Sequence, residues 1–206
     1  MDETRTSIEI ARLRPTQITV GMLQVKHKRK RLRALMRRPS ELVDFILEHP
    51  IRVVLGPRRQ AYVIDHHHLA LALMEERFET APVQVEHDFS TLKTAAFWRV
   101  MKAKGFAHPY DADGKEKPQR TIPGCLDELE DDPYRSLAGF VRLAGGFEKV
   151  CTPYAEFLWA DFYRAHIKKK FLKKDFDKTL KQAITLSRGP EAKKLPGFIK
   201  KQAVAK

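Results

Sequence analysis

In the first half of the chain, short β-branched runs alternate with stretches of helical hydrophobic spacing. Ile8–Leu13 alternates apolar and polar residues like an edge strand, which Pro15 ends. Residues 51–55 and 61–64 are rich in β-branched side chains and flank the turn Gly56–Arg59, so they predict a hairpin. Helices are expected on the basic run 26–38, from Ser40 to Pro50, from His67 to Arg77 and from Ser90 through Met101, with a further strand at 82–87. This order predicts a mixed sheet with helices.

The second half of the chain predicts helices after an acidic loop. Residues 106–131 hold several Gly and Pro and an excess of acids, which favours a linker or loop. Asp132-Pro133 and Thr152-Pro153 each combine an N-cap residue with a proline at the first helical position, and another helix is expected from Asp175 to Ser187. We therefore expect an α+β domain over 1–105, a linker or loop over 106–131, and a helical extension with a basic tail over 132–206.

One polar turn carries an unusual set of side chains. Asp65 and three consecutive histidines, His66, His67 and His68, stand between a predicted strand and a predicted helix. Unpaired N–H groups in the first helical turn attract anions, and imidazoles there can accept protons or hold a metal. Catalytic roles are expected for Asp65, His67 and His68, and a metal could bind Asp65 and His67. The alternative is structural: Asp65 caps the helix and the histidines are partly buried first-turn residues.

A second polar turn follows the first predicted strand. Thr16, Gln17 and Gly21 could present a hydroxyl, an amide and bare backbone to a ligand. We expect this turn to lie beside the Asp65–His68 turn, so that the two form one pocket.

Composition and charge indicate a folded protein with an anionic partner. The 206 residues are 43% hydrophobic, enough for a sizeable core, and the formal net charge is +13. Residues 26–38 hold eight Lys and Arg and no acid, and residues 164–206 hold fourteen against three acids. Both segments are expected to contact nucleic acid, although a solvated basic face is the simpler alternative. The candidate phosphate-binding residues are Thr16, Gln17, Gly21, Lys26, Arg29, Lys30, Arg33 and His66.

The same sequence argues against membrane insertion and a disulfide framework. No apolar run approaches the roughly 20 residues that span a bilayer, and Met1–Arg5 does not resemble a secretory signal. We therefore expect a cytoplasmic protein without a membrane partner. Cys125 and Cys151 form no close-spaced metal pair and are expected to be reduced.

An ordered set of short motifs resembles the bacterial family of ParB-like nucleases, within the ParB/sulfiredoxin superfamily. The motifs are Pro15-Thr16-Gln17 with Val20-Gly21, Val54-Leu55-Gly56-Pro57, Ile64-Asp65-His66-His67-His68, Phe97-Trp98, Asp132-Pro133-Tyr134-Arg135-Ser136-Leu137-Ala138 and Glu156-Phe157-Leu158-Trp159-Ala160-Asp161. The resemblance spans about Ile8 to Gly197. It implies a ParB/sulfiredoxin-like α+β fold, with a mixed sheet and helices, followed by an α-helical C-terminal extension.

The resemblance also implies chemistry at the histidine turn, which in the superfamily holds nucleotide phosphates between a glycine and an arginine. His66 and Leu69 stand at those two positions here, and Gln17 stands near the catalytic acid of the free-serine kinases. The possible cofactors are therefore a nucleotide (ATP, ADP or CTP) and a divalent metal ion, and the choice between them stays open.

Phosphodiester hydrolysis of nucleic acid is the leading hypothesis for function. His67 or His68 would activate water, Asp65 would orient a histidine or help hold a divalent ion, and Lys26 with its basic helix would hold the phosphates. The alternatives are a nucleotide-dependent phosphotransferase with a small substrate, and a DNA-binding or adaptor protein without catalysis. The oligomeric state is left open.

Overall fold

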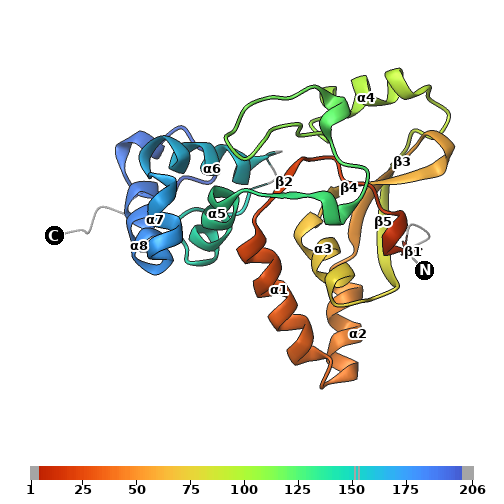
Figure 1. Ribbon diagram of the computed structural model, residues 1–206, viewed down its shortest axis with the longest axis horizontal. Helices are drawn as coiled ribbons and strands as arrows, with labels where there is room; N and C mark the ends of the chain where they lie inside the picture. The colour runs from red at the N-terminus through yellow and green to blue at the C-terminus, as the bar shows by residue number, and fades with distance from the viewer. Residues whose placement is uncertain (1–4, 151, 153, 201–206) are drawn as a thin grey trace. The chain divides into compact units, whose positions relative to one another are not determined.

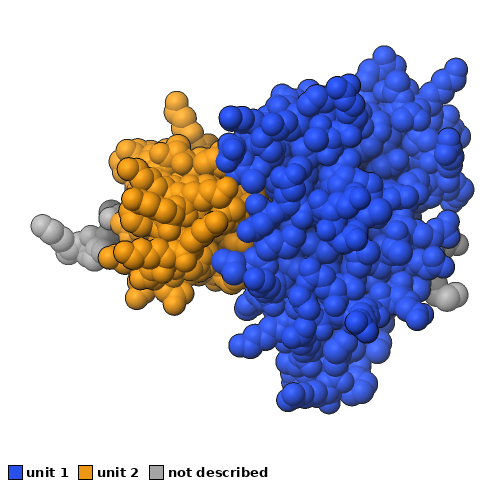
Figure 2. All heavy atoms as spheres, viewed as in Figure 1, with its two compact units in different colours: residues 1–131 blue, residues 132–206 orange. Residues whose placement is uncertain are grey.

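The computed structural model describes residues 5–150, 152 and 154–200 (Figure 1). The chain divides into two compact units, residues 1–131 and residues 132–206 (Figure 2). We call them unit 1 and unit 2. Among the described residues, no helix has both the length and the apolar character needed to cross a membrane.

Unit 1 is an α+β body, which confirms the expected fold class. Its helices and strands, in chain order, are β1 (Arg5–Glu9), β2 (Thr19–Val20), α1 (Met22–Leu35), α2 (Pro39–Glu48), β3 (Ile51–Gly56), β4 (Gln60–Asp65), α3 (His67–Glu75), β5 (Thr80–Asp88), α4 (Thr94–Ala103) and β6 (Glu130–Asp131). The main sheet has the order β1-β5-β3-β4. Its β3–β5 pair is parallel and its other pairs are antiparallel, so the sheet is mixed, as expected.

Strand β3 shows how the sheet separates two layers of side chains. Ile51 and Val53 belong to the large core formed with α1, α2 and α3, whereas Val54 packs with Phe97 and Met101 of α4. Successive residues of a strand point to opposite faces, so helices cover both faces of the sheet. Figure 1 shows α1, α2 and α3 on one side of the sheet and α4 on the other.

Several expected boundaries are wrong for local reasons. The first strand ends at Glu9 and continues as a 3-10 turn over Ile10–Arg12, because Ile10 and Leu13 both turn into the core. Pro39 takes the first position of α2. The expected cap Ser40 therefore lies inside the helix. Helix α4 begins after Lys93 rather than after Ser90.

Residues 106–131 are mostly irregular but packed into unit 1. Leu126 and Leu129 are buried in the same core as α1 and α3. Glu130 and Asp131 form β6, which pairs in parallel with β2. The segment therefore belongs to the body of unit 1, and the division of the chain falls after Asp131.

Gly56 provides a test of packing at the end of β3. A Cβ atom added there would lie 2.6 Å from Tyr62 Cε2 and 2.8 Å from Phe97 Cζ. Gly56→Ala should lower the free energy of unfolding by about 1–3 kcal/mol, because the two rings must shift. Gly124→Ala is the control, since the atom nearest to its added Cβ would be Arg14 Nη1, at 3.6 Å. Urea denaturation of both variants measures the difference, and equal midpoints would contradict this packing.

Unit 2 is helical, as expected for the extension. Its helices are α5 (Pro133–Leu143), α6 (Ala155–His166), α7 (Lys169–Lys174) and α8 (Phe176–Ser187). The expected cap Asp132 is confirmed, because its carboxylate accepts the N–H of Tyr134. The last helix begins as expected, and Asp175 caps it by accepting the N–H of Lys178. The N-cap of α6 is Tyr154 rather than Thr152. Pro153 and Cys151 lie outside the described residues.

Candidate functional site

Two hydrogen bonds join the histidine turn to the 15–21 turn. The N–H of Thr16 donates to His67 Nε2 at 3.3 Å, and the N–H of Gly21 donates to His68 Nε2 at 3.0 Å. Both histidines lie in the first turn of α3, and Gly21 directly precedes α1. The two polar turns are therefore neighbours, as expected, and the histidines fasten the start of α1 to the start of α3.

This arrangement gives His67 and His68 a structural role. Each Nε2 accepts a backbone N–H, so its lone pair already has a donor. The two residues are only 5% and 9% exposed. As they lie, these Nε2 atoms cannot take a proton from water.

The expected ligand groups of the 15–21 turn also have internal partners. The Thr16 hydroxyl donates to the Val63 carbonyl at 2.6 Å, and the Gln17 amide donates to the Thr19 carbonyl at 2.8 Å. Both residues are buried. The polar side chains of this turn therefore hydrogen-bond within the protein, and its backbone N–H groups hold His67 and His68 in place.

The hydrogen bond between Gly21 and His68 can be tested through stability. His68→Leu leaves the buried Gly21 N–H without an acceptor and should lower the free energy of unfolding by about 1–3 kcal/mol. His68→Gln can place an oxygen near the original Nε2 position and should lose distinctly less. Thermal or urea unfolding of the two variants gives the comparison. If Gln and Leu are equally destabilising, this hydrogen bond is not what His68 contributes.

His66 is the histidine of the run with an available basic nitrogen. Its Nδ1 lies 2.9 Å from the Pro50 carbonyl, so Nδ1 carries the proton and donates it. Nε2 then keeps its lone pair and has no hydrogen-bond partner among the described residues. Burial lowers the pKa of His66 below its ordinary value, although the Asp65 charge opposes this shift. His66 is therefore a neutral imidazole near pH 7, and it is only half-buried.

Two side chains from other elements also affect the pKa of this imidazole. Lys28 of α1 and His49 at the end of α2 both lower the pKa of His66. The ring centroids of His49 and His66 lie 6.4 Å apart. Lys28 of the basic helix therefore lies close to the histidine turn in unit 1.

Asp65 is exposed beside His66 and is not the helix cap. Its Oδ1 accepts the N–H of His66 at 2.7 Å, and His66 itself is the N-cap of α3. Asp65 is the last residue of β4, and in the strand register it lies opposite Arg52 of β3. Its carboxylate is therefore a solvent-facing acid next to a neutral imidazole.

The backbone of His66 is held in an unusual conformation. Its φ is 69° and its ψ is 24°, in the left-handed region that favours glycine. The absence of a glycine at this position has therefore not removed the turn geometry. A non-glycine residue there costs about 1–3 kcal/mol, and such positions concentrate at functional sites. Leu69, at the position of the superfamily's arginine, is buried in the core.

Helix α1 divides its basic residues into paired and unpaired groups. Arg29 contacts Glu75 at 2.6 Å and Glu76 at 2.5 Å, and Arg33 contacts Glu76 at 2.8 Å. These two arginines therefore hold α1 against α3. Lys26 and Lys30 are exposed and have no carboxylate partner among the described residues. They are the residues of this helix best placed for phosphate groups.

The second basic segment lies in unit 2. Lys168 and the lysines of α7 are exposed. Arg164, in contrast, forms ion pairs with Asp132 and Asp161. Residues 201–206 of the expected basic tail lie outside the described residues.

The residues expected to hold a metal do not form a matching set of ligands. Asp65 is solvent-exposed, whereas His67 is buried with Nε2 accepting from Thr16. In the described part of the chain, no three His, Cys, Asp or Glu side chains come together as metal ligands. We therefore derive no step of the chemistry through a metal bound to Asp65 and His67.

A pocket that the sequence analysis did not predict lies elsewhere in unit 1. It has a volume of about 470 Å³ and is lined by Arg14, Pro15, Pro57, Arg58, Gln60, Tyr62, Thr94, Trp98, Gln119, Arg120, Ile122, Pro123 and Gly124. Most of these residues are far apart in the sequence, so no local motif marks them. The only signal available was the presence of Arg, Tyr and Trp in separate polar stretches.

Comparison with known proteins places the chain in a family. The family model described as "Putative ParB-like nuclease" matches residues 6–165. The chain belongs to this family. The matched range includes the histidine turn, all of α1 and the pocket, which confirms the resemblance found in the motifs. No curated protein matches the chain.

A solved structure is similar over almost the whole length of this ParB-like chain. The crystal structure of protein Atu1540 from Agrobacterium tumefaciens has 42% sequence identity to it and a TM-score of 0.85. The match covers 95% of this chain and 97% of that chain. The α+β fold and its helical extension are therefore shared with that protein.

Proposed function

We propose that this ParB-like protein hydrolyses phosphodiester bonds of nucleic acid, with His66 as the general base. The observation that carries the proposal is the arrangement of the two ring nitrogens of His66. Its Nδ1 proton is held by the Pro50 carbonyl, and its Nε2 has no partner among the described residues. A base with a pKa below its usual 6.5 is unprotonated at neutral pH and can accept a proton from water. The base is thus His66, in place of the expected His67 or His68.

The reaction follows from the groups around that nitrogen. His66 Nε2 takes a proton from a water molecule while the water oxygen attacks phosphorus. The phosphorus–oxygen bond to one nucleoside breaks, and the departing oxygen takes a proton from solvent. The products are a phosphate monoester and a free hydroxyl. The Asp65 carboxylate stabilises the imidazolium formed in this step, because an opposite charge nearby favours the protonated ring.

Helix α1 supplies the positive charge that a nucleic-acid substrate requires. Lys28 is close enough to His66 to lower the pKa of its ring, so this helix brings positive charge close to the base. Lys26 and Lys30 extend the positive surface along the exposed side of the helix. Such contacts bind the phosphate backbone without reading its sequence.

The proposal is tested with the purified full chain and four substrates. Single- and double-stranded DNA and RNA are incubated with the protein, with Mg²⁺ and separately with a chelator, and new 5′-phosphate or 3′-phosphate ends are counted. We expect cleavage of at least one substrate, lost in a His66 variant. Binding without new ends in any condition would support the non-catalytic alternative and reject hydrolysis.

A further inference from the structure

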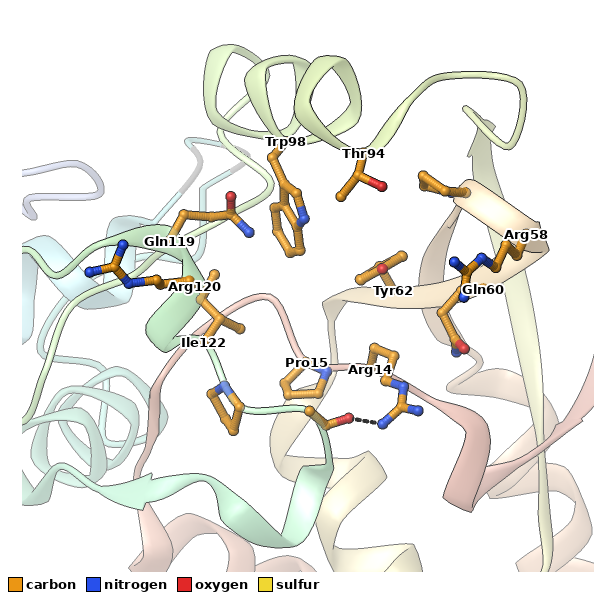
Figure 3. Close-up of a pocket in the computed structure, with 13 residues that line it drawn as sticks. Arg14, Pro15, Arg58, Gln60, Tyr62, Thr94, Trp98, Gln119, Arg120 and Ile122 are labelled. Atoms are coloured by element: carbon orange, nitrogen blue, oxygen red, sulfur yellow. Dashed lines mark hydrogen bonds between the residues drawn. The ribbon is translucent and has the colours of Figure 1, made fainter.

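The pocket of unit 1 described above combines positive charge with aromatic surface. We call it the arginine pocket. Its lining includes Arg14, Arg58 and Arg120 and contains no acidic residue. In Figure 3, the rings of Tyr62 and Trp98 face the space between α4 and the hairpin of β3 and β4. Its volume of about 470 Å³ lies in the range of small-molecule sites.

The aromatic wall is fixed by packing. The rings of Tyr62 and Trp98 meet edge to face, with their centroids 5.4 Å apart. The ring of Phe97, which is buried, has its centroid 4.7 Å from that of Tyr62. Tyr62 and Trp98 are only half-buried, so part of each remains accessible from the pocket. A nucleobase stacks on such rings whatever its identity, because every base has a π-face.

Two of the arginines lie near the Tyr62 hydroxyl. The positive charges of Arg14 and Arg58 both oppose the rise that burial causes in the pKa of Tyr62. The guanidinium of Arg14 is anchored, since it donates to the Gly124 carbonyl and lies 3.4 Å from Cys125 Sγ. Arg58 is exposed and has no carboxylate partner among the described residues. Arg120 points away from the rings in Figure 3, so it lies at the rim.

We propose that the arginine pocket binds a nucleoside phosphate. The base stacks on Trp98 and Tyr62, and Arg58 and Arg14 contact the phosphate. A guanidinium suits phosphate oxygens because its N–H donors form a planar fork. The pocket shares no residue with the proposed hydrolytic site at Asp65 and His66, so each can fail without the other. The nucleoside phosphate could be a free mononucleotide or one nucleotide of a single strand.

Arg58 offers a matched pair of variants. Arg58 and Arg59 both have a positive φ, 59° and 55°, and asparagine tolerates that region well. Arg58→Asn removes a charge from the pocket. Arg59→Asn removes the same charge from the adjacent residue, whose side chain forms an ion pair with Asp88 and does not line the pocket.

The experiment measures binding to the full chain by titration calorimetry and by tryptophan fluorescence. The probes are nucleoside triphosphates, the matching nucleosides, pyrophosphate, and short single-stranded oligonucleotides. We expect nucleotides or oligonucleotides to quench Trp98, with a signal that Trp98→Phe removes. Arg58→Asn should weaken binding about tenfold and Arg59→Asn less than twofold. Trp98→Ala alone should weaken binding about tenfold relative to the wild type, in line with the loss of one stacking contact.

The probes also identify the source of the ligand. Tighter binding of mononucleotides indicates a free nucleotide, and tighter binding of oligonucleotides indicates a strand; either supports the proposal. Pyrophosphate binding as tightly as a triphosphate would overturn it, because the base then contributes nothing. Absence of binding, or binding that Arg58→Asn and Trp98→Ala leave unchanged, would overturn it too. Unfolding curves of each variant show that it remains folded, and Trp98→Phe keeps an aromatic ring if Trp98→Ala does not fold.

Discussion

His66→Asn should reduce the rate of nucleic-acid cleavage by about 10²–10⁴-fold, the usual contribution of a positioned general base. Asparagine tolerates the left-handed backbone at this position, and its side-chain amide can donate to the Pro50 carbonyl as the imidazole does. Stability should therefore change little. The variant lacks only the nitrogen that accepts a proton. Initial rates at saturating substrate, with unfolding curves for both proteins, give the comparison.

His68→Gln is the control within the same run of histidines. It removes an imidazole two residues away and can retain an acceptor for the Gly21 N–H. Its cleavage rate should stay within about threefold of the wild type. A large loss of rate in His68→Gln together with normal turnover in His66→Asn would reverse the roles assigned to these two histidines.

The second large effect is expected on binding. Replacing Lys26, Lys30 and Arg37 by alanine should weaken nucleic-acid binding by about 10–100-fold at low salt. It should also make the dependence of log K on log salt shallower by about 2–3, since each lost phosphate contact removes close to one unit of slope. These side chains are exposed and have no carboxylate partner among the described residues, so stability should hardly change. Titrations at several salt concentrations measure both quantities.

Arg29→Ala with Arg33→Ala is the matched variant on the same helix. These arginines contact Glu75, the last residue of α3, and Glu76, which follows it, so their loss should reduce stability and change the salt slope much less. An equal change of slope per charge removed in both variants would mean that net charge, and not the exposed side chains of Lys26, Lys30 and Arg37, determines binding.

The hydrophobic pattern was sufficient to predict the main elements of unit 1. β-Branched runs around Gly56–Arg59 became the β3–β4 hairpin, and most of the basic run 26–38 lies in α1, as expected. The position of 106–131 could not be predicted in the same way. Leu126 and Leu129 are two apolar residues in an acidic, irregular stretch, and only their contacts with α1 and α3 show that they belong to the core.

The roles of the three histidines could not be predicted from their order. They differ through long-range partners: the Pro50 carbonyl for His66, Thr16 for His67 and Gly21 for His68. These contacts decide which ring nitrogen stays available, and nothing in the local sequence encodes them. The left-handed backbone of His66 was likewise unexpected, because histidine does not mark such a position as glycine would.

The pH dependence of cleavage by the wild-type chain tests the central claim most directly. His66 is active only when unprotonated, and burial lowers its pKa below 6.5. The rate should therefore rise with pH through a single titration below 6.5 and level off above about pH 7. The residual activity of His66→Asn should lack this titration. The absence of any acid-side titration over the whole pH range in which the protein stays folded, or the same titration in His66→Asn, would contradict the assignment of His66 as the base.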